Sequence, residues 1–323
     1  MPHPPPLAAA PPAPARIASA LGLALLAAAP AAGARPPWLA LALEAGARED
    51  RLDWNIAGSL DGTGPNVLSE LTWSRLRMVE LRARAAARLR GPWLLALQGG
   101  YGRIRSGRNR DSDYLGDNRT LEYSRSENRG GGAVQDWSAA LAWRRPLAGE
   151  GRPAYLTVLA GAARREQRLT ITDGVQTVTD GTVPLGPIDG LDSRYRARWQ
   201  GPWVGLRLDA PWGPAGFLSL AASYHWADFE GVGDWNLRQD WDHPVSFVHE
   251  TTARGVEASL ELERPLAGRW RGGLRASWRR WWGRPGLDTV RQRTATGISL
   301  LQTRLNQVRW SSLAAGVHLR LDF

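Results

Sequence analysis

The C-terminal stretch Leu313-Ala314-Ala315-Gly316-Val317-His318-Leu319-Arg320-Leu321-Asp322-Phe323 alternates between two kinds of side chain. Successive side chains of a β-strand point to opposite faces of the sheet. One face of this strand would therefore carry small and polar residues. The other face would carry apolar residues and end on the terminal aromatic, namely Leu313, Ala315, Val317, Leu319, Leu321 and Phe323.

The same period of two recurs in residues 79–86, 256–263 and 274–279. The apolar positions carry aliphatic residues with Trp near the ends, while the polar positions carry both Arg and Glu. This pattern is typical of a strand with lipid on one side and a polar lumen on the other. In lipid, only a helix or a closed barrel pairs every backbone group. No stretch is long and apolar enough for a membrane helix, so we predict an all-β fold, a ten-stranded antiparallel transmembrane β-barrel.

Ten strands are expected, near residues 48–60, 66–89, 93–106, 118–145, 154–172, 191–209, 215–229, 245–264, 270–283 and 302–323. Their connections alternate between short turns and longer polar loops, and the loops are expected at 61–65, 107–117, 173–190, 230–244 and 284–301. Bacterial outer-membrane barrels place short turns in the periplasm and long loops outside. An even number of strands places both chain ends on the periplasmic side, and a C-terminal Phe is typical of this class. The predicted location is the outer membrane of a Gram-negative bacterium, in contact with its lipid.

The first residues have the features of an export signal. Arg16 precedes the apolar run 17–29, and Ala32-Gly33-Ala34 provides a small-residue cleavage site. We therefore predict a secretory signal peptide over 1–34, a short N-terminal segment over 35–47 and the barrel over 48–323. A disordered Pro- and Ala-rich leader is the alternative.

Composition excludes several kinds of function. The chain of 323 residues contains no Cys, so it has no disulfide and no Cys-based metal or nucleophile site. Its formal charge is +10 and all its basic residues are Arg, but no nucleic-acid-binding motif accompanies them. We predict no cofactor, no metal site and no nucleic-acid partner. The run 111–119 resembles a calcium loop in composition but lacks Glu at the required spacing, which leaves weak calcium binding there as an alternative.

Five segments, in order along the mature chain, carry a family resemblance: Val67–Trp73, Gly99–Gly102, Ser106-Gly107 with Asp111–Tyr114, Leu159–Gly161 and Tyr195–Leu206. On these segments the chain resembles the omptins, ten-stranded outer-membrane endopeptidases. The resemblance implies an omptin-like barrel whose activity, if retained, would be cleavage of a peptide bond beside a basic residue.

The resemblance also indicates site residues. Omptins hold an Asp-x-Asp pair in the second outer loop and an Asp-x-His pair in the fourth, where His and carboxylate activate water. Asp111 and Asp113 match the first pair, and Asp240, Asp242 and His243 lie where the second is expected. Here His243 directly follows its Asp. A shift of one residue in a strand turns a side chain to the other face.

Several functions therefore remain open. The first hypothesis is an omptin-like surface barrel whose loops bind an extracellular peptide or protein, or are vestigial. The alternatives are an active endopeptidase, an adhesin and a narrow pore. Four further residues, Arg75, Arg77, Arg103 and Arg105, are candidates for binding lipopolysaccharide phosphates, because guanidinium groups bind phosphate in a bidentate manner. A structural ion-pair role is the alternative for them, and nothing in the sequence indicates an oligomeric state.

Overall fold

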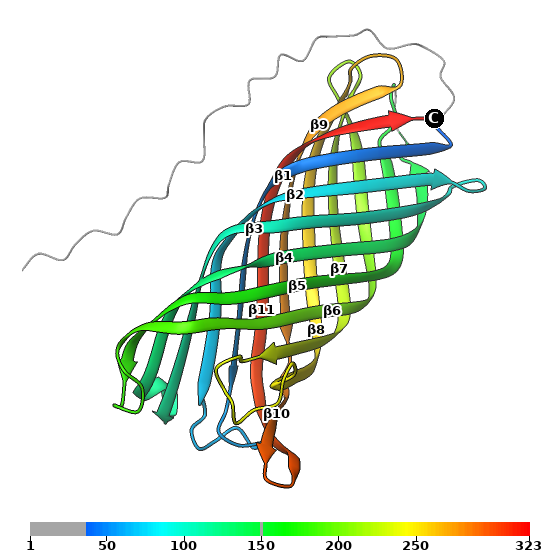
Figure 1. Cartoon of the computed structure of the whole chain (residues 1–323). Coiled ribbons are helices and arrows are strands. Elements are labelled where there is room, and N and C mark those ends of the chain that lie inside the picture. The colour runs from blue at the N-terminus through cyan, green and yellow to red at the C-terminus, as the bar shows by residue number, and fades with distance from the viewer. Residues whose placement is uncertain (1–36, 149–150) are drawn as a thin grey trace, which may run out of the picture.

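The first and last strands of the chain pair with each other and close a barrel (Figure 1). The computed structural model describes residues 37–148 and 151–323. Besides the 3₁₀ turn η1 (Asp117–Arg119), its elements are β1 (Leu39–Ile56), β2 (Ser69–Arg88), β3 (Trp93–Gly116), β4 (Thr120–Pro146), β5 (Tyr155–Thr179), β6 (Gly186–Trp212), β7 (Gly216–Asp234), β8 (Phe247–Pro265), β9 (Trp270–Gly283), β10 (Gly286–Thr294) and β11 (Gly297–Asp322). Among the described residues, no helix is long and apolar enough to cross a membrane.

The eleven segments form a barrel of ten strands, because β9 and β10 together make one. Both segments pair with β8 on one side and with β11 on the other, and only residues 284–285 interrupt them. All pairings between neighbouring strands are antiparallel, and β1 closes on β11 from Ala40↔Asp322 onward. The ten-stranded antiparallel barrel predicted from the alternation is confirmed.

The first strand is longer than predicted. β1 begins at Leu39, so the expectation of a separate segment over 35–47 is wrong for residues 39–47. These residues pair with the closing strand on one side and with β2 on the other. Residues 39–43, Leu-Ala-Leu-Ala-Leu, are all apolar and so do not display the alternation that revealed the other strands. The predicted signal peptide over 1–34 lies outside the described residues.

Three of the expected outer loops are also mostly strand. Residues 107–116 belong to β3, residues 173–179 and 186–190 to β5 and β6, and most of 284–301 to β10 and β11. The outer-end connections are therefore 57–68, 117–119, 180–185, 235–246 and 295–296. Strands that rise above the membrane have water outside them, so their outward positions are polar. A strand without an apolar outer face reads as a loop in the sequence.

The outer wall carries a belt of exposed apolar side chains near the end of the barrel where the C-terminus lies. We call it the lipid-facing belt: Leu41, Leu43, Val79, Leu81, Leu95, Leu97, Leu141, Val158, Val204, Leu206, Leu220, Leu260, Leu274, Leu313, Val317 and Leu319. Exposed aromatics border it on the periplasmic side (Trp38, Trp93, Trp212 and Trp270) and on the outer side (Tyr101, Trp137, Trp226 and Trp278). An apolar band between aromatic girdles is the surface that a bilayer requires.

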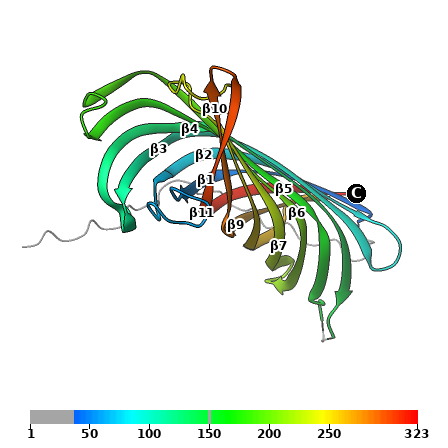
Figure 2. The same ribbon diagram turned by 90° about the horizontal axis from the view of Figure 1, so that it is seen from below.

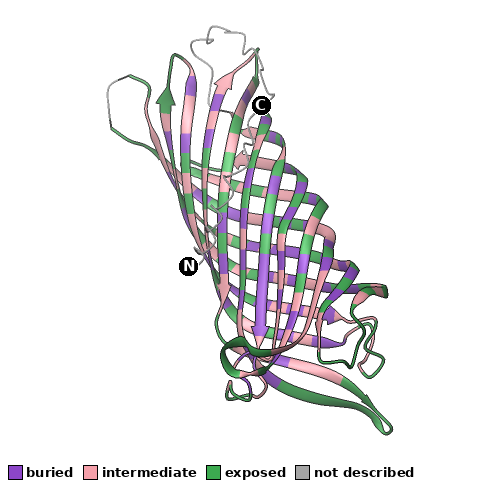
Figure 3. Cartoon of the chain, turned by 90° about the vertical axis from the view of Figure 1, so that its left-hand side faces the viewer, coloured by how far each residue is buried: buried purple, intermediate pink, exposed green. Residues whose placement is uncertain are grey.

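Along each strand, the inward positions alternate with these exposed ones, as the striped colouring of Figure 3 shows. At the level of the belt, the inward residues are charged. Arg48, for example, contacts Asp50, Glu80 and Asp136 at 2.7, 2.9 and 2.8 Å.

Above the belt, the inward residues are apolar and fill the lumen. We call this cluster the aromatic plug, and its largest members are Trp54, Trp73, Tyr195, Trp199, Phe229, Phe247, Trp281 and Trp310. The barrel is therefore polar inside where lipid surrounds it and apolar inside where water surrounds it.

Candidate functional site

The predicted site residues lie at the outer end of the barrel, above the aromatic plug. Asp111 and Asp113 are on β3, next to β2 and β4. The other three candidates lie in the 235–246 connection, which Figures 1 and 2 show beside β10. A bridge between Trp241 and Gln292 of β10 holds that connection in place.

Asp111 and Asp113 form the acidic part of this outer mouth. Both are half-buried, and Oδ1 of Asp111 is buried without a hydrogen-bond partner among the described residues. Burial raises the pKa of Asp111 well above its usual value, and the charge of Asp113 raises it further. Burial also raises the pKa of Asp113, although the Ser69 hydroxyl and the charge of Arg238 partly offset this. The positive charge around the two carboxylates therefore does not fully balance their negative charge.

Arg238 supplies positive charge to this region, and that charge acts to lower the pKa of Asp113. Its guanidinium donates two hydrogen bonds to Asp240, at 2.9 and 2.7 Å, and lies 4.0 Å above the ring of Trp241. The hydrogen bond from Arg238 lowers the pKa of Asp240. Asp240 therefore holds the arginine in place and is not available to orient a histidine.

Asp242 has a different partner from the one predicted. It accepts hydrogen bonds from Arg291 at 3.0 and 2.8 Å, and Arg293 lies 3.6 Å away. The hydrogen bond from Arg291 lowers its pKa. Asp242 thus attaches the 235–246 connection to β10.

His243 pairs with a residue that the sequence analysis did not select. Its Nδ1 lies 2.6 Å from Oδ1 of Asp234, the last residue of β7, and its Nε2 lies 3.2 Å from the carbonyl oxygen of Arg238. Both ring nitrogens therefore lie against protein oxygens. Neither nitrogen is free to contact a water molecule in this arrangement, as a general base must.

A second histidine lies below the mouth. His249 on β8 is fully buried, with Nδ1 3.0 Å from the Tyr195 hydroxyl and Nε2 3.2 Å from Asp288. It packs against Trp54, with ring centroids 4.6 Å apart. The sequence offers one indication of this group, because Tyr195 lies in a segment that carries the omptin resemblance. It does not indicate that β6, β8 and β10 bring the three residues together.

The region considered for calcium does not gather its carboxylates. Residues 111–116 are strand, and Oδ1 of Asp117 accepts a hydrogen bond from the backbone of Asn66 at 2.7 Å. Within the described part of the chain, one group of three or more ligand-type side chains has its donor atoms within 4.8 Å of one another: Glu261, Glu263 and His318. It lies at the other end of the lumen.

The four candidate lipopolysaccharide arginines lie together on the outer wall. Arg75, Arg77, Arg103 and Arg105 are exposed on the adjacent strands β2 and β3. Val79 of the lipid-facing belt pairs with Arg103, so the group stands at the outer border of the belt. Arg77 also pairs with Glu49 at 2.8 Å.

Comparisons with known proteins agree with this architecture. The sequence profile described as "Pom: Protochlamydia outer membrane protein" matches residues 42–323. Among solved structures, the outer-membrane protease OmpT of Escherichia coli is similar with a TM-score of 0.73 at 12% identity, over 88% of this chain and 96% of that one. The translocator domain of the autotransporter NalP of Neisseria meningitidis has a TM-score of 0.35 at 12% identity, over 88% of each chain. No curated protein matches the sequence. At this identity, the likeness to OmpT is one of fold alone.

Proposed function

The chain belongs to the Protochlamydia outer membrane protein family, and from that premise we propose that it is a closed outer-membrane barrel that binds a cationic group of an extracellular peptide or protein at its outer mouth. The observation that carries this proposal is the half-buried pair Asp111 and Asp113, which lacks a full complement of positive charge. An arginine side chain fits such a pair because its planar guanidinium bonds carboxylates in a bidentate manner.

Arg238 indicates how the ligand would be held. Its guanidinium combines a carboxylate, Asp240, with an aromatic face, Trp241, and it places its charge near Asp113. An arginine of a bound ligand would make the same kinds of contact, with a carboxylate and with an aromatic ring. In this proposal Arg238 occupies part of the mouth until a ligand displaces it.

The test is binding of a fluorescent peptide with an Arg-Arg sequence to the purified barrel in detergent, followed by anisotropy. Asp113→Asn should weaken binding by about tenfold or more, since a charge-assisted contact is lost. Arg238→Ala should strengthen it by removing the internal competitor. Asp173→Asn is the matched control, because Asp173 is exposed on β5 and lies beside an arginine of its own, Arg129. Equal affinity for the wild type, Asp113→Asn and Asp173→Asn would contradict the proposal.

Endopeptidase activity is the second candidate, favoured by one observation. The ion pair of Asp234 with His243 supplies a carboxylate and an imidazole in the connection near Arg238. Catalysis would require the Nε2 contact with the Arg238 carbonyl to open, which would free that nitrogen to accept a proton. Whole cells that display the barrel would be incubated with a quenched peptide containing an Arg-Arg bond. Cleavage that is lost in Asp113→Ala, His243→Ala and Asp234→Asn would establish this activity, and absence of cleavage would remove it.

Arg75, Arg77, Arg103 and Arg105 are proposed to contact lipid phosphates, because they are exposed at the outer border of the lipid-facing belt. The double substitution Arg103→Gln with Arg105→Gln should reduce the lipopolysaccharide that copurifies with the barrel. The control is Arg129→Gln with Arg168→Gln, whose side chains are exposed, at 64% and 61%, on β4 and β5 outside this group of four. Equal lipopolysaccharide content in the two double variants would refute this assignment.

A further inference from the structure

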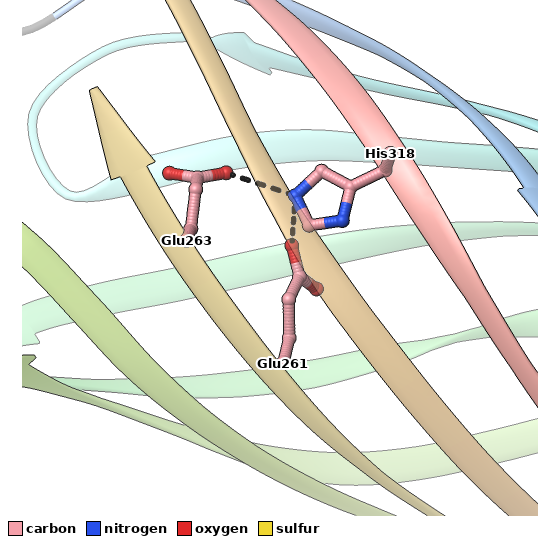
Figure 4. A group of neighbouring side chains, drawn as sticks. All are labelled: Glu261, Glu263 and His318. Carbon is pink, nitrogen blue, oxygen red and sulfur yellow. Dashed lines mark ion pairs between the residues drawn. The ribbon is translucent and has the colours of Figure 1, made fainter. Parts of the chain in front are cut away.

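A histidine and two glutamates meet on the inner wall of the barrel near its periplasmic end (Figure 4). His318 is on β11, and Glu261 and Glu263 are on β8. The strand between them, β9, pairs Gly273 with both Glu263 and His318. The three strands thus place Glu263 and His318 at the same level of the sheet. Glu261 lies two residues away from Glu263 on the same inner face.

The separations of the donor atoms match those of ligands on one metal ion. His318 Nε2 lies 3.2 Å from Oε1 of Glu261 and 3.5 Å from Oε2 of Glu263. Zinc bonds of about 2.0–2.1 Å in a tetrahedron place neighbouring ligand atoms about 3.3 Å apart. One imidazole and two carboxylates are also a donor set that zinc accepts.

The imidazole points to a ligand because it is buried between two carboxylates without a hydrogen bond to either. The side chain of His318 is fully buried, and neither ring nitrogen makes a hydrogen bond within the described part of the chain. Figure 4 shows Nε2 directed toward both carboxylates, but neither contact has hydrogen-bond geometry. A buried polar atom left in this way carries a desolvation cost, which a bond to a metal ion would offset.

Arginines bond the two carboxylates mainly through the oxygens that do not face His318. Arg84 donates to Oε2 of Glu261 at 2.7 Å and more weakly to Oε1 at 3.1 Å. Arg271 and Arg320 both bond Oε1 of Glu263, which leaves Oε2 toward the histidine. Outer partners of this kind fix the orientation of metal ligands.

Gly273 leaves the space in which the three side chains meet. A Cβ atom at this position would lie 2.6 Å from Cε1 and 3.0 Å from Nε2 of His318. Any other residue would therefore push the imidazole away from the glutamates.

We propose that Glu261, Glu263 and His318 form a binding site for a divalent transition-metal ion, best matched by zinc, which braces the closing strand β11 against β8. The site is separate from the outer mouth and does not depend on the function proposed there. The alternative is that the three side chains contact one another directly and hold no ion.

The first measurement uses the wild-type barrel, refolded with zinc and freed of unbound ions by gel filtration. Elemental analysis should find one zinc per chain, and refolding with cobalt should give the visible absorption bands of a tetrahedral site with nitrogen and oxygen ligands. A barrel that folds but retains neither ion would overturn the proposal.

Variants then locate the ion. His318→Ala and Glu263→Gln should each fold, as judged by migration on unheated gels, and the bound ion should fall from one per chain to none. His225→Ala is the matched control, because His225 is also a buried lumen histidine and lies 3.9 Å from Glu257. Metal that is retained in both site variants, or lost equally in the control, would place the ion elsewhere and refute the assignment.

Discussion

Single residues in this barrel differ in how their buried charge is compensated. Arg48 lies in the lumen among three carboxylates within 3 Å, whereas Asp111 at the mouth has a buried oxygen with no partner among the described residues. Removing one member of a compensated group leaves a buried charge alone, which is strongly destabilising. Removing the charge of Asp111 should have the opposite effect. A residue whose uncompensated charge lowers the stability of the fold is a candidate for binding a ligand of opposite charge.

The first prediction concerns Asp111→Asn. The folded state raises the pKa of Asp111, so it binds the proton more tightly than the unfolded state does. Stability should therefore fall as the pH rises from the ordinary aspartate pKa through the raised value, and ionised Asp111 should destabilise the barrel above it. Asp111→Asn should raise the midpoint of thermal unfolding by roughly 2 °C at neutral pH, and the difference should vanish below the ordinary pKa of aspartate.

Thermal unfolding would be followed by gel migration over a series of pH values. Asp173→Asn serves as the control, because Asp173 is exposed. A midpoint difference that does not change with pH, or an equal effect in the control, would show that burial of Asp111 is not the cause.

Along a single strand, the apolar and the polar side chains exchange faces. In β2, Val79 and Leu81 face outward while Glu80 and Arg82 are buried inside. Further along the same strand, the buried residues are apolar, as at Trp73. At this level the surroundings of the outer wall change from lipid to water. Each half of the strand therefore turns inward the side chains that its outer surroundings disfavour: charged ones in lipid and apolar ones in water.

The second prediction compares two exposed leucines. Leu274 on β9 is 57% exposed and Leu300 on β11 is 59% exposed, but only Leu274 belongs to the lipid-facing belt. Leu274→Arg should destabilise the barrel in lipid vesicles by about 2–4 kcal/mol, the cost of an arginine in the bilayer interior. Leu300→Arg should change its stability little, because that part of β11 lies above the belt.

Urea unfolding in vesicles measures both variants under the same conditions. Similar losses of stability for the two substitutions would mean that the bilayer lies elsewhere on the wall.

The molecule as a whole is a barrel with a filled lumen. The aromatic plug receives side chains from strands all around the wall, from Trp54 on β1 to Trp310 on β11. Below it, the charged residues are joined by ion pairs across the lumen, such as Arg84 with Glu261 at 2.7 Å. The buried side chains of the plug and the ion pairs below it occupy the lumen, which argues against the pore hypothesis.

The third prediction follows from this filling. The purified barrel, inserted into planar bilayers, should give no regular single-channel steps, because ions would have to cross both the apolar plug and the paired charges. A porin inserted under the same conditions provides the positive control. Reproducible conductance steps would show that the lumen opens.

One part of the fold was accessible from the sequence, and another was not. The alternation at Leu313–Phe323 revealed a strand facing lipid, since the period of two is local and needs no partner. The outer part of β3 was mistaken for a loop, because its outward residues, such as Arg108 and Arg110, face water. The alternation of apolar and polar residues is visible where a strand has lipid outside and charged residues inside. It weakens where both faces of the strand carry polar residues.

The sequence by itself determined that this chain is a ten-stranded outer-membrane barrel, and it selected Asp111 and Asp113 as a pair in what it took for a loop but the structure shows as strand. Only the tertiary structure decided that His243 pairs with Asp234, that Asp240 and Asp242 are taken up by arginines, and that His318 meets Glu261 and Glu263. The physical reason is strand register. Alternation places a side chain on a face, but the pairing of strands distant in sequence determines which side chain lies opposite it.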